Sequence, residues 1–169
     1  DLYMLQMKLC GDLVLREKCA PITEITPDVL DILDEMVGMM RDQNGVGLAA
    51  PQVGYLKRFL VMMNPDDETV SKMINPKIIT RSAEQCTMEE GCLSVLGHDN
   101  LPVYANVTRP ASVEVEWMNE HGEQLRAQMA GLPARIVQHE TDHLDGILFI
   151  DYLSPVRREM VMRKVRKRK

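Results

Sequence analysis

The segment QHETDHLDG, residues 138–146, contains the residue types of a hydrolytic metal site. His139 and His143 are four positions apart, so on a helix both imidazoles leave the same face and can hold one metal ion. Glu140 would lie about 100° round the helix from His139, where it could take a proton from a water on that ion. The spacing therefore predicts a catalytic HExxH centre, with chance histidines on a solvent-facing helix as the alternative.

The third protein ligand decides the class of such a site. A metzincin would continue HExxHxxGxxH, but Phe149 stands where its last histidine should be, which excludes that class. A thermolysin-like site takes a downstream glutamate, and the only one after His143 is Glu159, within a basic tail. The third ligand is therefore expected upstream of the helix.

Six upstream side chains could supply it: Cys10, Cys19, Cys86, Cys92, His98 and His121. Cys92 follows Gly91, a residue that permits a close approach of the backbone. A lone cysteine is nevertheless more often a small buried hydrophobe than a ligand. Spacing alone thus ranks Cys92 only modestly above Cys86 and His98.

Three separated motifs carry a family resemblance: GVGLAAPQ at 45–52, EGCLS at 90–94 and QHETDHLDG at 138–146. In this order they resemble the signature motifs of peptide deformylases, and the resemblance extends to LFIDYLSP, covering most of the chain. It implies a metal-dependent hydrolase of protein biosynthesis that removes the N-formyl group from the N-terminal formylmethionine of newly made polypeptides and releases formate.

The resemblance also implies roles for single residues. The metal ligands would be Cys92, His139 and His143. Glu140 would be the general base, with the Gln52 side chain and the Leu93 backbone N–H stabilising the oxyanion. The substrate, with its methionine side chain in an apolar pocket, would contact Val46, Gly47, Gly91, Leu132 and Ile136.

One divalent ion per chain is expected. A thiolate with two imidazoles suits ferrous iron, zinc, nickel or cobalt, and the resemblance implies Fe2+ in the cell, with Zn2+, Ni2+ or Co2+ as substitutes. The chain departs from the family pattern after EGCLS, where members commonly carry a proline. Here Leu96 follows Val95 and opens a longer connection, VLGHDNLPVYANVTRP.

Other functions fit fewer of these residues. A metallopeptidase would also use the HExxH motif, but this alternative does not explain the EGCLS and GLAAPQ motifs. A ribosome- or RNA-binding protein with structural zinc would need a fourth protein ligand, and none is evident near the motifs. The pattern GxGxxA within 45–50 also matches a weak dinucleotide-binding motif, but the preceding segment has helical rather than strand periodicity.

The surrounding segments predict an α+β fold of short, mostly antiparallel strands around a central metal-binding helix. Helices are expected from the Thr26 cap to Asn44, from about Pro133 to Leu144, and as a basic C-terminal helix at about 154–169. Between them, GVGLAAPQVG predicts a glycine-rich loop. The strand candidates, by apolar runs or alternation, are RFLVMM, INPKIIT, SVEVEWM and EQLRAQM.

Length and composition predict one catalytic domain spanning residues 1–169. The hydrophobic fraction is 45%, the charged fraction is 27%, and no apolar run approaches the roughly 20 residues of a membrane span. The start, DLYMLQMKLCGD, has no leader pattern, so a bacterial cytoplasm is expected, with an organelle after presequence removal as the alternative. Neither a membrane nor DNA is expected as a partner.

The charge is uneven. The whole chain carries −5, yet Arg157–Lys169 holds eight basic residues and one acidic residue. A basic tail on an acidic body favours contact with a polyanion such as the ribosome, and a merely solvated helix is the alternative. The resemblance supports the ribosome, because in bacterial members a helical tail is associated with docking there.

Overall fold

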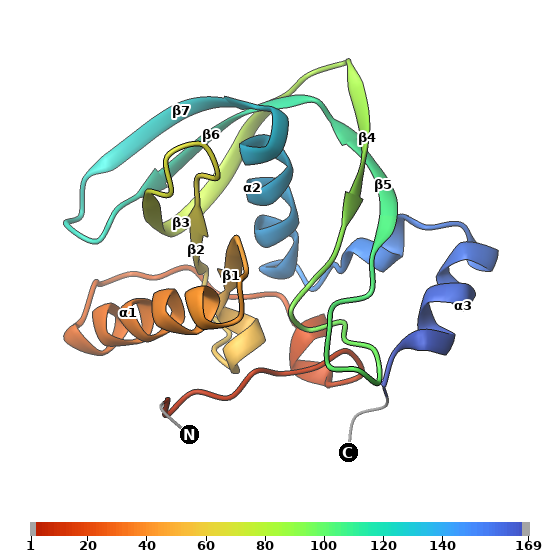
Figure 1. Ribbon diagram of the computed structural model, residues 1–169. Coiled ribbons are helices and arrows are strands. Elements are labelled where there is room, and N and C mark those ends of the chain that lie inside the picture. Colours follow the sequence, from red (N-terminus) through yellow and green to blue (C-terminus); the bar gives the residue numbers. More distant parts are fainter. Residues whose placement is uncertain (1–2, 167–169) are drawn as a thin grey trace.

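The computed structural model describes residues 3–166. Two sheets surround one helix: a five-stranded sheet in the order β1-β2-β3-β6-β7, and a two-stranded sheet formed by β4 and β5. Every pair of neighbouring strands is antiparallel. Figure 1 shows α2 in the middle, with the larger sheet curving round it and β4–β5 on the other side. The predicted α+β class with a central helix is confirmed. Among the described helices none is long and apolar enough to cross a membrane.

The first helix, α1 (Pro27–Asp42), begins as predicted. The Thr26 side chain accepts a hydrogen bond from the Val29 N–H, and Pro27 occupies the first turn, where its missing N–H costs nothing. The buried side chains recur at helical spacing and pack against β1 and β2, forming one of three apolar clusters. They are Leu33, Met36, Met39 and Met40.

The larger sheet contains the predicted strands. They are β2 (Phe59–Met63), β3 (Val70–Arg81), β6 (Ser112–Met118) and β7 (Gln124–Ala130). In β6 the alternation seen in the sequence holds, since Val113, Val115 and Trp117 are buried, and they join the cluster that packs beneath α2. The sheet thus gives α2 a fixed apolar floor.

The glycine-rich segment is a strand rather than the predicted loop. Residues Gly47–Ala49 form β1, fully buried and paired with β2, and a short 3-10 helix at Ala50–Val53 follows. The loop prediction was based on the glycines and missed that Leu48 is buried in the cluster of α1 and β2, and Ala49 in the cluster beneath α2. The segment therefore enters the core, with β1 beside α2 (Figure 1).

The central helix α2 runs over Gly131–His143. It starts two residues earlier than predicted, because Gly131 takes a left-handed φ of 62° directly after β7 and turns the chain into the helix. The Leu144 N–H closes the last turn, and Gly146, with φ of 74°, leads the chain away. Nine of its thirteen residues are buried, so the helix lies inside the molecule.

The sequence did not predict β4 (Gln85–Glu90) or β5 (Ala105–Pro110). Both carry alternating polar and apolar residues with few β-branched side chains, so their strand signal is weak. The connection between them holds the rest of the EGCLS motif and the long segment after it. A third apolar cluster lies under this connection and joins it to a 3-10 helix at Phe149–Tyr152 and to α3.

The C-terminal helix α3 (Pro155–Lys164) is shorter than the predicted 154–169. Its start is as predicted, with the Ser154 side chain accepting from the Arg157 N–H. It ends because Val165 takes an extended backbone and pairs with Gly97, so that a β-branched residue leaves the helix for a strand-like contact. The remainder of the predicted helix, 167–169, lies outside the described residues.

Candidate metal centre

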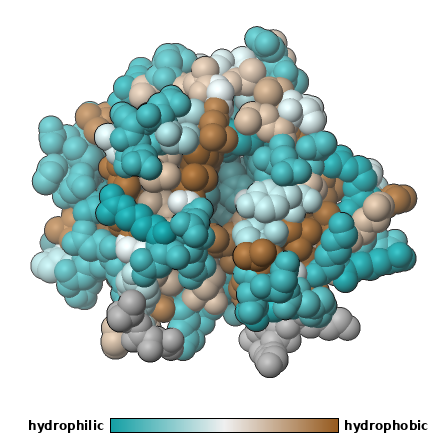
Figure 2. Space-filling model, in the orientation of Figure 1, coloured by the Kyte–Doolittle hydropathy of each residue, from teal (hydrophilic) through white to brown (hydrophobic). Residues whose placement is uncertain are grey.

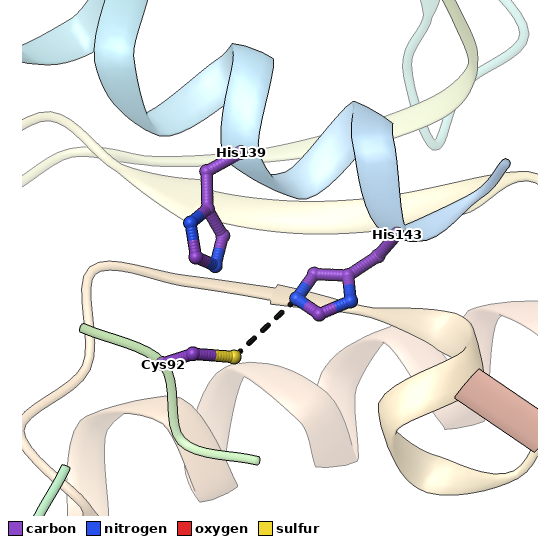
Figure 3. Close-up of side chains that lie close together, drawn as sticks. All are labelled: Cys92, His139 and His143. Carbon is purple, nitrogen blue, oxygen red and sulfur yellow. Dashed lines mark hydrogen bonds between the residues drawn. The ribbon is translucent and has the colours of Figure 1, made fainter. Parts of the chain in front are cut away.

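Three side chains converge at the end of α2. The ligand atoms of Cys92, His139 and His143 all lie within 4.8 Å of one another, and all three residues are buried. Figure 3 shows the two imidazoles leaving adjacent turns of α2 and pointing toward the Cys92 thiol on the neighbouring chain segment. The Cys92 Sγ is 3.4 Å from the His143 Nε2, a separation that two ligands of one tetrahedral ion adopt.

Cys92 reaches this position because it follows β4 directly. Residue Glu90 is the last of that strand, and its carboxylate accepts a hydrogen bond from the His139 Nδ1 at 2.9 Å. Although burial opposes ionisation, bonds from His139 and Arg109 lower the pKa of Glu90, so it is an ionised acceptor. With Nδ1 bonded to Glu90, Nε2 is the ring atom of His139 left to face an ion.

Two arginines hold Glu90 in turn. Arg109 donates through Nε (2.6 Å) and Nη2 (3.0 Å) as a bidentate pair, and Arg135 donates through Nη1 at 2.6 Å. All three side chains are almost completely buried. Arg135 also bonds the Val107 and Cys86 carbonyls, which ties this network to β4 and β5.

The network extends further from the metal ligands through Arg109. Its Nη1 donates to Asp142 at 2.8 Å, and Asp142 also accepts from the Tyr152 hydroxyl at 2.7 Å. The Arg109 guanidinium lies over the Tyr152 ring, 4.6 Å from its centroid. The sequence did not assign roles to these residues. Glu90 stood inside a recognised motif, but Arg109 and Arg135 become partners only through the fold.

The two histidines have opposite electrostatic environments. Burial opposes protonation of His139, but the nearby Glu140, Cys92 and Glu90 raise its pKa well above the ordinary value. Burial and the charge of His139 lower the pKa of His143 well below its ordinary value. A neutral His143 keeps a lone pair for a metal ion, and its ring packs edge-on against His139, with centroids 5.1 Å apart.

Glu140 is buried beside the ligands. Its Oε2 lies 3.9 Å from the His139 Nε2, and its Oε1 has no hydrogen-bond partner among the described residues. Burial raises the pKa of Glu140 to about 7, with His139 acting in the opposite direction. A carboxyl group with a pKa near neutrality can both accept and return a proton.

The glycine at position 47 makes room for this carboxylate. A Cβ built on Gly47 would lie 2.5 Å from the Glu140 Oε2, closer than any real side chain tolerates. Strand β1 can therefore pass against Glu140 only with glycine at this point. Packing against Glu140 therefore explains the second glycine of the GVGLAAPQ motif.

Gln52 faces the thiol from the short 3-10 helix after β1. Its Oε1 accepts from the Ala49 N–H at 2.9 Å, which fixes the amide so that Nε2 points to Cys92 Sγ (3.5 Å) and Ser94 Oγ (3.0 Å). The Leu93 N–H has no acceptor among residues 3–166. Two donors that could stabilise a developing oxyanion, Gln52 Nε2 and the Leu93 N–H, thus belong to residues of one cavity.

This cavity, of about 180 Å³, contains most of the residues that the sequence proposed. In Figure 2 apolar surface flanks a hollow near the middle of the visible face. His143 is not among the cavity-lining residues, and His98, the alternative ligand, lies in a different hollow. Cys86, the other alternative, is only half-buried and lies in β4. The proposed residues that line the cavity are Val46, Gly47, Gln52, Gly91, Cys92, Leu93, Leu132, Ile136, His139 and Glu140.

All the comparisons with known proteins point to one family. The sequence model described as Polypeptide deformylase matches residues 4–159. A peptide deformylase of Halothermothrix orenii is 44% identical over 158 residues, covering 94% of this chain and 99% of the relative. One of Rhizobium meliloti is 40% identical over 159 residues, covering 92% of this chain and 88% of the relative.

Solved structures agree with the sequence relatives. The crystal structure of a peptide deformylase from Legionella pneumophila superposes with a TM-score of 0.87 at 34% identity, covering 96% of this chain and 93% of that one. A peptide deformylase from Synechococcus elongatus in complex with actinonin gives a TM-score of 0.87 at 35% identity, covering 96% and 86%.

Proposed function

The chain belongs to the polypeptide deformylase family, and we propose that it removes the formyl group of N-formylmethionyl peptides at the site formed by Cys92, His139 and His143. The observation that carries this proposal is the convergence of the three family motifs on one buried cavity. A metallopeptidase would share the two histidines but would leave Cys92 and Gln52 unexplained.

The donor set fits one divalent ion. The thiol and two imidazoles are buried and mutually close, and the Glu90 carboxylate holds one imidazole in the tautomer that a ligand needs. A soft thiolate with two nitrogens suits Fe2+, Zn2+, Ni2+ or Co2+, and we propose Fe2+ in the cell by analogy with the family. When bound, such an ion would lower the pKa of a coordinated water toward neutrality and so supply the nucleophile.

Glu140 is the proposed proton carrier. Its carboxylate lies beside the His139 Nε2, on the side of the cavity where the attacking water must lose a proton. The same carboxyl group then delivers this proton to the amine that leaves with the peptide. Its pKa of about 7 suits both steps, because neither the charged nor the neutral form is strongly favoured at neutral pH.

Gln52 and Leu93 are the proposed oxyanion donors. Attack on the formyl carbonyl places negative charge on oxygen, and preorganised N–H groups stabilise that charge without having to reorient. The Ala49 N–H fixes the Gln52 amide, and its Nε2, which donates to Cys92 Sγ and Ser94 Oγ, would exchange one of these bonds for the oxyanion. The Leu93 N–H has no acceptor among the described residues, so it is available as the second donor.

The substrate side chain is proposed to lie against Val46, Leu132 and Ile136. Ile136 is buried, while Leu132 and Val46 are 39% and 37% exposed at the opening of the cavity. These apolar side chains suit the unbranched methionine side chain. Gly47 and Gly91 would leave the backbone open to hydrogen bonding with the peptide.

Outside the site, we propose that the protein acts in a bacterial cytoplasm and that the basic helix α3 brings it to the ribosome. Arg157, Arg158 and Arg163 are exposed. Exposed cations on one short helix favour a polyanion, and such contacts weaken as salt rises. Co-sedimentation of ribosomes with the triple alanine variant should fall below wild type at low salt, and equal co-sedimentation would leave the helix merely solvated.

A formate assay tests the activity directly. Freshly metallated protein should release formate from a formyl-Met tripeptide, while mass spectrometry shows the internal bonds intact. An acetyl-Met peptide should react much more slowly, because its extra methyl group has little room beside Cys92 and the Leu93 backbone. Internal cleavage without formate would indicate a metallopeptidase, and tightly held metal without turnover would indicate structural zinc.

A further inference from the structure

The segment after EGCLS, residues 95–104, forms one wall of the cavity and is called the rim loop here. It is a small hairpin: Leu96 pairs with Pro102, the Gly97 N–H bonds the Leu101 carbonyl, and the Val103 N–H bonds the Val95 carbonyl. Asn100 closes the turn in a left-handed conformation, with φ of 63°. The longer connection noted in the sequence is therefore an ordered structure.

The C-terminal segment adds a third strand-like edge to this hairpin. Val165 pairs with Gly97, the Arg166 N–H donates to the Leu96 carbonyl at 2.9 Å, and the Arg166 Nη1 donates to the Asn100 Oδ1 at 2.6 Å. Figure 1 shows the β4–β5 connection reaching the end of α3. Two residues near the C-terminus thus hold the first arm and the turn of the rim loop, and the hairpin bonds join this arm to the second one.

The contact is anchored in the apolar core. Val165 is buried in the same cluster as Val95 and the metal ligand Cys92. Burial of this apolar side chain stabilises the segment in addition to its hydrogen bonds. The tail cannot be displaced from the rim loop without exposing this cluster.

The opposite edge of the rim loop faces the substrate cavity. Pro102 and Tyr104 line it together with Gly91. The Tyr104 ring lies against Gly91 so closely that a Cβ there would be 2.5 Å from a ring carbon. Tyr104 is 56% exposed, whereas the metal ligands are buried, so the ring lies at the mouth rather than at the bottom.

We propose that Val165 and Arg166 are positioning residues for peptide binding, which act through the rim loop on Pro102 and Tyr104. This inference rests on the proposed function. The first residue of a peptide lies near the buried ligands, so Tyr104 meets the residues that follow it. Without the contacts of Val165 and Arg166, which brace the rim loop, the substrate would have to order this loop as it binds. Longer peptides would then bind more weakly, while the chemical step would not change.

The test compares three metal-loaded proteins: wild type, a chain ending at Lys164, and the Arg166→Ala variant. Their substrates are formyl-Met amide and a formyl-Met tripeptide. For the tripeptide, KM should rise about two- to tenfold in the shortened chain, since ordering each side chain on binding has a cost that corresponds to this range. Arg166→Ala should give a smaller rise, while kcat and metal content stay at wild-type values and KM for the amide changes little.

Matched controls separate positioning from general damage. A chain ending at Arg166 and the Met160→Ala variant, which changes an exposed side chain on the same helix, should behave as wild type. Adding Tyr104→Ala to the shortened chain should raise KM less than the two changes predict independently, because both act on one contact.

Three results would overturn the inference. They are an equal rise in KM for both substrates, a fall in kcat with unchanged KM, and full additivity with Tyr104→Ala. A wild-type protein that releases no formate would remove the proposed function itself, and this inference with it.

Discussion

The bottom and the rim of the catalytic cavity are built in different ways. At the bottom, two candidate ligands come from adjacent turns of one buried helix. Glu90 bonds His139 and is itself bound by Arg109 and Arg135, at distances of 2.6–3.0 Å. At the rim, a hairpin of ten residues is held from outside by two C-terminal residues. The bottom can keep its geometry while the rim changes, so binding of the ion and binding of the peptide should respond to different substitutions.

The largest effect should follow from removing a ligand. Cys92→Ser, His139→Ala and His143→Ala should each lose both metal and activity, because a catalytic site with three protein ligands has none to spare. Cys86→Ser is the control. Cys86 is half-buried and lies in β4, so this variant should keep both its metal and its activity. Near-stoichiometric metal in Cys92→Ser, measured by elemental analysis, would reject the ligand assignment.

Glu140→Gln should reduce turnover without reducing metal content. The substitution keeps size and a hydrogen bond but removes the base, so turnover should fall by about 10²–10⁴-fold with metal retained. The measurement is single-turnover formate release together with metal content. Wild-type turnover in this variant would show that another group carries the proton.

The charged network behind His139 should affect metal affinity more than turnover. Glu90→Gln leaves Arg109 and Arg135 buried without their shared anion and weakens the bond that orients the imidazole. Metal affinity should fall by about 10–100-fold, as for other partners of ligating histidines. Glu89→Gln, which changes the exposed neighbour in β4, is the matched control. Equal metal-release rates in a chelator competition would contradict this role.

The smallest effect is expected at the turn of the rim loop. Asn100→Ala removes the bond to Arg166 and places a less tolerant residue at φ of 63°. The free energy of unfolding should fall by about 1 kcal/mol, which corresponds to a Tm lower by about 2–4 °C for a protein of this size. Metal affinity should not change. Glycine adopts the left-handed turn without strain, so Asn100→Gly should recover part of the lost stability. An equal Tm for Asn100→Ala and Asn100→Gly would exclude backbone strain as the cause.

The placement of the two histidines on one face of a helix could be predicted from the sequence, because its signals are local. The spacing of His139 and His143 requires only a helix, and the caps at Thr26 and Ser154 are read within four residues. Cys92 could not be chosen from spacing alone. It needed the family resemblance, since a single cysteine has no periodic signal.

The rim and the network could not be read from the sequence, because their contacts join distant positions. Glu90 meets Arg135 across 45 positions, and Arg166 meets Asn100 across 66. The basic tail was expected to be one helix to the end, but the partner that ends it at Lys164 is Gly97, far away in the chain. A composition-based prediction cannot include such a partner, and for the same reason the tail was treated as separate from the site.

The pairing of Val165 with Gly97 also sets an order of events during synthesis. The set of three candidate ligands is complete once His143 has been made, whereas the rim loop gains its brace only with Val165. These positions are about 22 residues apart, which at about 5–20 residues per second is a delay of about 1–4 s. During that interval all three candidate ligands have been made while the residues that brace the rim loop have not, so a chain cut short before Val165 would keep the ligands and lose the brace.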